Sequence, residues 1–267
     1  MRTAVCIHGL SRGSTVLSSG AYDEKFKSLK NKIKDCDVFI HSWDIDIEEK
    51  IKNIFNPISF LFEKQKTFHK EKISFNTCDI YSKNTSPRQG DIFKTLSFLY
   101  SRMKSIELKR EKEIKENFIY DCVLTTRFDV GHHNFGKNKT SHLSFDCSKD
   151  MNMIYQAFWD QMNAGLSDHW FYSSSKNIDK IGNLYNCLFE YINPNSEYAQ
   201  LCRTGWPLSN ERDEFSNEML KKEKTEKLKR LTVGKTLLVN NHCLYKYHFI
   251  KNNLLDKSIF LNEELWK

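Results

Sequence analysis

The amino-acid sequence predicts a three-layer α/β fold, in which helices flank a mostly parallel sheet and a helical C-terminal extension follows. Residues 2–8 form a short β-favouring run, and residues 26–33 repeat apolar positions at spacings of three and four. Residues 37–41 form a second apolar run. A strand, a helix and a strand in this order favour a parallel pair, and parallel strands need helices on both faces.

The composition is that of a globular chain. Its 267 residues include 41 Lys and Arg against 34 Asp and Glu, a net charge of +7, with 39% hydrophobic and 13% aromatic residues. The aromatic content excludes a disordered chain, and no apolar run approaches the roughly 18 residues that a membrane span requires. The basic balance suits anionic partners, whether nucleic acid, a lipid surface or nucleotide phosphates.

Two features predict a cytoplasmic protein. The N-terminal apolar run is short and ends at Gly9, so we expect no signal peptide. The 8 cysteines are dispersed, without a C-x-x-C pair, as is typical of reduced thiols rather than of a zinc module.

Further elements follow from the same patterns. Apolar positions between Asp91 and Lys115 predict a long amphipathic helix, and we expect Ser101 and Lys104 on its solvated side. The remaining predicted elements are strands at residues 118–126, 151–155 and 170–172, helices at 178–192 and 209–230, and a strand at 231–239.

Polar residues gather where three predicted strands end, and the clusters are Gly9, Ser11 and Arg12, then His41, Trp43 and Asp44, then Arg127 and Asp129. Because the carboxyl ends of parallel strands meet at one edge of a sheet, we expect these clusters to form one ligand site. Backbone N–H groups and a guanidinium suit a diphosphate, and a carboxylate suits a divalent cation or a ribose hydroxyl. A plain surface turn explains residues 9–13 equally well, since they lack the spacing of a P-loop or a dinucleotide fingerprint.

Four segments carry a resemblance to a known group of proteins. They are VCIHGLSRG at residues 5–13, DVFIHSWD at 37–44, YDCVLTTRFDV at 120–130 and DHWFYSS at 168–174. In order and spacing they resemble a group of glycosyltransferases found in bacterial polysaccharide clusters and in large algal viruses. The resemblance covers about residues 1–195 and implies a fold similar to that of the GT-A nucleotide-diphospho-sugar transferases.

The resemblance implies a glycosyltransferase that moves a sugar from a nucleotide-diphosphate-sugar donor to a hydroxyl of a glycan or lipid-linked glycan acceptor. It implies a single domain over residues 1–267, in which residues 1–130 bind the nucleotide sugar and residues 131–267 form the acceptor side and end in helices. We expect no nucleic acid as a partner and no transmembrane segment in the chain. Peripheral contact of the protein with a membrane stays open.

Carried over by position, Gly9, Ser11 and Arg12 would contact the nucleotide, and the other residues of the three clusters would line the same donor site. Asp129 would stand where the metal-binding D-x-D motif of GT-A enzymes ends. Arg127 replaces the first Asp of that motif. A Mn²⁺ or Mg²⁺ cofactor would therefore be held mainly by Asp129 and the donor's phosphates. Alternatively, Arg127 neutralises phosphate charge directly or pairs with a neighbouring acid.

An inverting transfer needs a carboxylate that takes the proton of the acceptor hydroxyl. We expect Asp168 to be this base, because residues 163–167 present it on a flexible stretch just before a strand. Capping of that turn is the alternative role of Asp168, and Asp44 and Asp213 are weaker alternatives as the base. A retaining transfer needs no such base, and the sequence leaves both stereochemical outcomes open.

Two other functions stay open at this stage. The Lys-rich segment 221–230 favours a basic module that binds nucleic acid or membrane lipid, although glutamates interrupt its charge. A catalytically inactive protein would still bind the nucleotide sugar. His132, His133 and His242 are further candidates for metal ligands, and a surface or core-edge position is the alternative for each.

Overall fold

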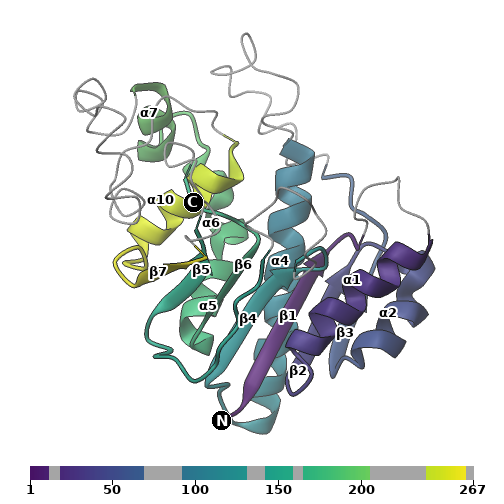
Figure 1. The fold of residues 1–267 in the computed structure, drawn as a ribbon. Coiled ribbons are helices and arrows are strands. Elements are labelled where there is room, and N and C mark those ends of the chain that lie inside the picture. The colour runs from purple at the N-terminus through teal and green to yellow at the C-terminus, as the bar shows by residue number, and fades with distance from the viewer. Residues whose placement is uncertain (12–18, 69–91, 131–141, 159–164, 205–238, 263–267) are drawn as a thin grey trace.

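One seven-stranded sheet forms the centre of the computed structural model (Figure 1). The structure describes residues 1–11, 19–68, 92–130, 142–158, 165–204 and 239–262. The strands are β1 (Thr3–Gly9), β2 (Asp37–Ser42), β3 (Ser59–Phe62), β4 (Cys122–Arg127), β5 (Ile154–Ala157), β6 (Trp170–Ser173) and β7 (Ser258–Leu261). The helices are α1 (Ser19–Lys32), the 3₁₀ helix η1 (Ile45–Ile47), α2 (Glu48–Phe55), α4 (Ile92–Glu116), α5 (Ser175–Gly182), α6 (Leu184–Tyr191), α7 (Glu197–Thr204) and α10 (Asn241–Lys251).

The strands lie in the order β3-β2-β1-β4-β6-β5-β7. β1 pairs in parallel with both β2 and β4, β2 with β3, and β5 with β7. β6 is antiparallel to its two neighbours, β4 and β5. The predicted α/β class with a mostly parallel sheet is therefore confirmed.

Helices cover both faces of the sheet, and β1 shows why. Its side chains alternate, so that Val5 and Ile7 pack in one apolar core while Ala4 and Cys6 pack in the other. The first core also includes Phe26 of α1 and residues of α2, and the second includes the apolar side of α4 and parts of α5, α6 and α10. Figure 1 shows α1 and α2 on one side of the sheet and α4 on the other.

Several of the predicted elements have different bounds in the structure. β4 begins only at Cys122, because the N–H groups of Phe118 and Tyr120 donate to the backbone carbonyl and the carboxylate of Glu113 near the end of α4 and not to a neighbouring strand. β5 begins at Ile154 rather than at residue 151. The helix predicted for residues 178–192 is two helices, α5 and α6, which meet at Asn183.

The C-terminal part is more than a helical extension. After α10 the chain returns to the sheet as β7, which pairs with β5 at the edge. β3 and α2 were not predicted either. The helix predicted at residues 209–230 and most of the strand predicted at 231–239 lie outside the described residues. None of the described helices, the 25-residue α4 included, has the apolar length that crossing a membrane requires.

Candidate functional site

The candidate site lies where the strand order reverses. β1, β2 and β3 follow one another toward one edge, whereas β4 lies on the other side of β1. In open α/β sheets, ligands bind beyond the carboxyl ends of the strands at such a reversal. Arg127 ends β4 and Asp129 follows it. Asp168 comes to the same end, because β6 is antiparallel to β4 and its first residue, Trp170, pairs with Thr126.

Arg127 lies between two carboxylates. Its Nε donates to Oδ1 of Asp129 over 2.8 Å, and its Nη2 donates to Oδ2 of the same carboxylate. Its Nη1 lies 3.9 Å from Oδ1 of Asp168. The side chains of Arg127 and Asp129 are 32% and 28% exposed, and that of Asp168 is 9% exposed. The Arg127–Asp129 pair, which solvent reaches, therefore lies beside the largely buried carboxylate of Asp168.

Both carboxylates are ionised at neutral pH. Burial by itself would raise the pKa of Asp129, but the Arg127 guanidinium outweighs it and lowers that pKa. Burial would likewise raise the pKa of Asp168, but electrostatic interactions of its carboxylate with His242, His169 and Arg127 outweigh burial and hold that pKa well below the usual range. Burial lowers the pKa of His169 to about 4, so at neutral pH this ring is neutral and the guanidinium of Arg127 supplies a permanent positive charge. Asn241 adds a weak contact, with its Nδ2 3.5 Å from Oδ2 of Asp168.

A second guanidinium, that of Arg102 on α4, lies behind Asp168 and is 1% exposed. Its Nη2 donates to the backbone carbonyl of Asp168 over 2.5 Å, its Nε to Nε2 of His8 over 2.9 Å, and its Nη1 to the hydroxyl of Tyr245 over 2.6 Å. Burial and the Arg102 charge hold the pKa of His8 well below its usual value, so His8 is neutral and can accept this bond. Arg102 therefore connects β1, α10 and the backbone at Asp168 through hydrogen bonds.

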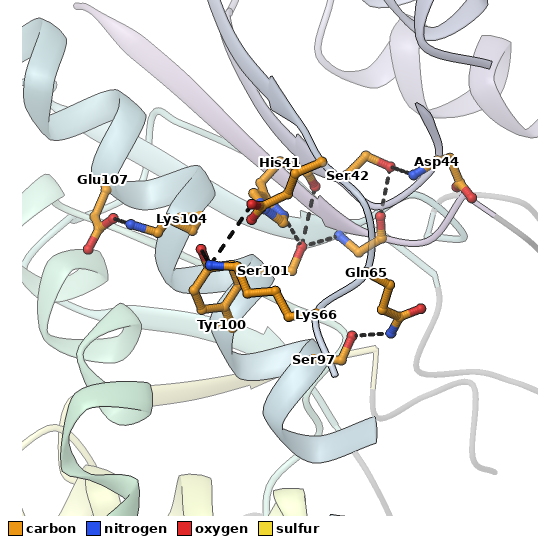
Figure 2. A network of polar contacts seen from close by, with 12 residues as sticks. His41, Ser42, Asp44, Gln65, Lys66, Ser97, Tyr100, Ser101, Lys104 and Glu107 are labelled. Atoms are coloured by element: carbon orange, nitrogen blue, oxygen red, sulfur yellow. Dashed lines mark hydrogen bonds and ion pairs between the residues drawn. The ribbon is translucent and has the colours of Figure 1, made fainter. Parts of the chain in front are cut away.

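The end of β1 is fixed by hydrogen bonds inside the protein (Figure 2). The Gly9 N–H donates to Oγ of Ser101 over 2.7 Å, and Oγ of Ser42 donates to the Gly9 carbonyl over 3.0 Å. The N–H and the hydroxyl of Ser11 both donate to Oδ2 of Asp44, each over 2.5 Å. These two N–H groups are therefore engaged within the protein, and direct contact of Gly9, Ser11 or Asp44 with a ligand stays a prediction.

His41 is fully buried behind this segment. Its Nε2 lies 3.0 Å from Oε1 of Glu63 and its Nδ1 lies 2.7 Å from Oγ of Ser101. Because a carboxylate only accepts, Nε2 carries the proton and Nδ1 accepts from the Ser101 hydroxyl. Burial lowers the pKa of His41, which keeps the ring neutral. His41 thus holds the Ser101 hydroxyl, which in turn accepts a hydrogen bond from the Gly9 N–H. Because its ring is enclosed, we interpret His41 as a residue that supports the end of β1.

The solvated position predicted for Ser101 is wrong, because its side chain is fully buried and takes part in this network. Lys104, in contrast, is partly exposed and pairs with Glu107 over 2.6 Å (Figure 2). Trp43 is 5% exposed and stacks on Tyr100 with ring centroids 5.5 Å apart. Trp43 therefore belongs to the apolar core under the site, the position that an aromatic residue usually has.

The described residues do not provide a set of ligands for a metal ion. No group of three or more His, Cys, Asp or Glu side chains that could hold one is present among them. Both oxygens of Asp129 already accept hydrogen bonds from Arg127, and Nδ1 of His242 lies 2.7 Å from the carbonyl oxygen of Leu166. Arg12, His132, His133 and Asp213 lie outside the described residues.

The supporting residues of α4 were not predicted from the sequence, although a signal for them exists. Polar residues recur at every fourth position of this helix, and all are buried: Ser97, Ser101, Ser105, Lys109 and Glu113. A four-residue repeat lines one side of a helix, so these residues form a polar stripe beside the apolar one. Arg102 follows Ser101 of this stripe in the chain and is buried as well.

No protein-family model, no curated protein and no solved structure matches this chain. The resemblance of its four motifs to a group of glycosyltransferases therefore stays a prediction. The site has to be interpreted from its own chemistry.

Proposed function

We propose that this protein is a glycosyltransferase that moves a sugar from a nucleotide-diphosphate-sugar donor to a hydroxyl of a glycan acceptor. The observation that carries the proposal is the meeting of Arg127, Asp129 and Asp168 at the edge where the strand order reverses. A guanidinium suits the donor's phosphates, and a carboxylate next to it suits the proton of the attacking hydroxyl. The order of the sequence motifs supports the same function.

In an inverting reaction, the acceptor oxygen forms a bond to the anomeric carbon of the sugar as the bond from that carbon to the phosphate oxygen breaks. The nucleoside diphosphate leaves, and Asp168 takes the proton of the acceptor hydroxyl. The pKa of Asp168 is lowered in the free protein, so it is ionised and ready to accept. Donor phosphates on Arg127 would offset the positive charge around Asp168 and raise that pKa, which makes the carboxylate a stronger base.

The first test is a thermal-shift panel of uridine, guanosine, adenosine, cytidine and thymidine diphosphates and their sugars. A ligand at about 100 times its Kd stabilises a protein by roughly 2.7 kcal/mol, which is readily measured. We expect one nucleotide series to raise the melting temperature. If none does at millimolar concentration, the proposal fails, and binding of nucleic acid or lipid becomes the function to test by its salt dependence.

The second test separates the roles of the carboxylates. With the donor from the panel and a mixture of glycan acceptors, we expect Asp168→Asn to abolish release of nucleoside diphosphate but to keep donor binding. Asp129→Asn should lose both, because Arg127 loses its partner. Asp121→Asn is the matched control, since Asp121 is exposed at the opposite end of β4. Full activity of Asp168→Asn would remove it from the reaction, and donor binding without any turnover in the wild type would identify an inactive donor binder.

A further inference from the structure

The surroundings of Arg127 bear on how the phosphates of a donor would be held, and this inference rests on the proposed function. Asp129 is the one carboxylate that remains of the metal-binding pair implied by the resemblance. Its two oxygens each accept a hydrogen bond from the same guanidinium, over 2.8 Å to Oδ1 and in closer contact to Oδ2. This bidentate geometry is the strongest that an Arg and a carboxylate form.

A divalent cation does not fit this arrangement. Mg²⁺ binds carboxylate oxygens at about 2.0–2.1 Å. On Asp129, the ion would therefore have to displace the guanidinium or lie within a few ångströms of its positive charge. The nearby Asp168 does not complete a site, because its Oδ1 faces Nη1 of Arg127 at 3.9 Å and its Oδ2 faces Asn241 at 3.5 Å. The described residues contain no set of three or more ligands.

The guanidinium itself keeps donors for a ligand. An Arg side chain has five N–H donors, and the contacts with Asp129 use one on Nε and one on Nη2. The 3.9 Å between Nη1 and Asp168 is too long for a hydrogen bond. Within the part of the chain that the structure describes, the other N–H groups of Arg127 have no hydrogen-bond acceptor, and 32% of this side chain at the end of β4 is exposed. Two N–H groups on a planar fork match two oxygens of one phosphate group.

We propose that the protein binds the diphosphate of its nucleotide sugar without a divalent cation, with the guanidinium of Arg127 as a built-in positive charge where a metal ion would otherwise lie. Asp129 then holds and orients Arg127 and does not ligate a metal. The buried guanidinium of Arg102, whose hydrogen-bond partners among the described residues are neutral acceptors, adds a second fixed positive charge behind Asp168. That charge compensates the Asp168 carboxylate.

The test measures binding of the nucleoside diphosphate that the panel selects, by calorimetric titration of the full chain, in EDTA and in Mn²⁺ or Mg²⁺. We expect Kd values within threefold of one another. Arg127→Met, which keeps length and removes charge, should weaken binding of the diphosphate at least tenfold but leave binding of the parent nucleoside unchanged. Arg110→Met is the matched control, because Arg110 is an exposed residue of α4 that pairs with Asp179.

Arg127→Asp, which restores the D-x-D pattern, gives the converse test. We expect its binding of the diphosphate to be weak in EDTA and to be recovered by Mn²⁺. A wild-type protein that binds at least tenfold more tightly with Mn²⁺ than in EDTA would overturn the inference and leave the proposed function standing. Failure of every nucleoside diphosphate to bind, with or without a cation, would overturn both.

Discussion

Replacement of Ser101 by Ala tests the network that fixes the end of β1. The change removes the acceptor of the Gly9 N–H and the donor to Nδ1 of His41, both at 2.7 Å. The His41 ring is left fully buried, where water does not replace the lost partner, and the Gly9 N–H is left half-buried. An unsatisfied buried polar group costs about 1–3 kcal/mol, and the lost hydrogen bond of the half-buried Gly9 adds to this cost, so the change should lower the free energy of unfolding by about 3 kcal/mol.

The expected loss is measurable in two ways. For a chain of 267 residues, an unfolding entropy of about 2.1 cal/mol/K per residue converts about 3 kcal/mol into a melting temperature lower by about 5 °C. Calorimetry measures this shift, and urea unfolding should show a lower midpoint with an unchanged slope. The unchanged slope would show that the folded and unfolded states keep their compactness.

Ser97→Ala is the matched control on the same helix. Ser97 accepts a hydrogen bond from Nε2 of Gln65 over 2.7 Å, and the half-buried Gln65 can turn to water instead (Figure 2). We expect a loss below about 1 kcal/mol for this change. If Ser101→Ala and Ser97→Ala shift the melting temperature equally, the network does not stabilise the end of β1, and our reasoning about His41 as its support is wrong.

Three further predictions concern other parts of the fold. Burial lowers the pKa of His248 to about 4, below the ordinary 6.5, so the unfolded state takes up the proton first as the pH falls. This group should therefore lower the free energy of unfolding by about 2 kcal/mol from pH 7 to pH 5. Urea unfolding at several pH values should show the fall, and a flat profile would contradict it. Lys109→Ala removes the ammonium group that pairs with the buried carboxylate of Glu113 and the partly exposed one of Asp179, and it should cost about 3 kcal/mol in urea unfolding. Lys112→Ala, which breaks a surface pair with Glu116, should cost below about 1 kcal/mol, and equal losses would contradict a stabilising role of the Lys109 pairs. Gly165→Ala places a Cβ 2.1 Å from the backbone oxygen of His242 at a φ of +104°, and it should cost about 3 kcal/mol or more of stability. Gly9→Ala, at a φ of +98° in open space, should cost about 1–2 kcal/mol. If the melting temperature measured by calorimetry falls no further for Gly165→Ala than for Gly9→Ala, the close approach at Gly165 is contradicted.

The elements with a clear repeat were predictable from the sequence. β1 and β2 are continuous apolar runs, as strands with both faces buried are, and the 25 residues of α4 repeat apolar positions on a helical period. β3 and β7 were missed, because each has only 4 residues at an edge of the sheet and is too short to show a period in the sequence. The break at Asn183 was missed because the apolar spacing continues across it from α5 into α6.

The candidate site was predictable in part. The polar clusters follow β1, β2 and β4 in the sequence, and they could be expected to lie near one another because parallel strands end on the same side of a sheet. Arg127 and Asp129 could be expected to pair because they are only two residues apart. Asp168 was singled out from its place before a strand. That it lies beside Arg127 depends on the antiparallel direction of β6, which its four-residue apolar sequence does not encode.

The sequence by itself determined the local elements, since hydrophobic period, turn residues and polar strand ends are properties of neighbouring residues. Only the tertiary structure decided which of those polar ends support one another. Arg102 meets the carbonyl of Asp168 across 66 positions of the chain, and Ser101 meets His41 across 60. Such pairs depend on where a helix crosses a sheet, and buried polar groups must find partners wherever that crossing places them.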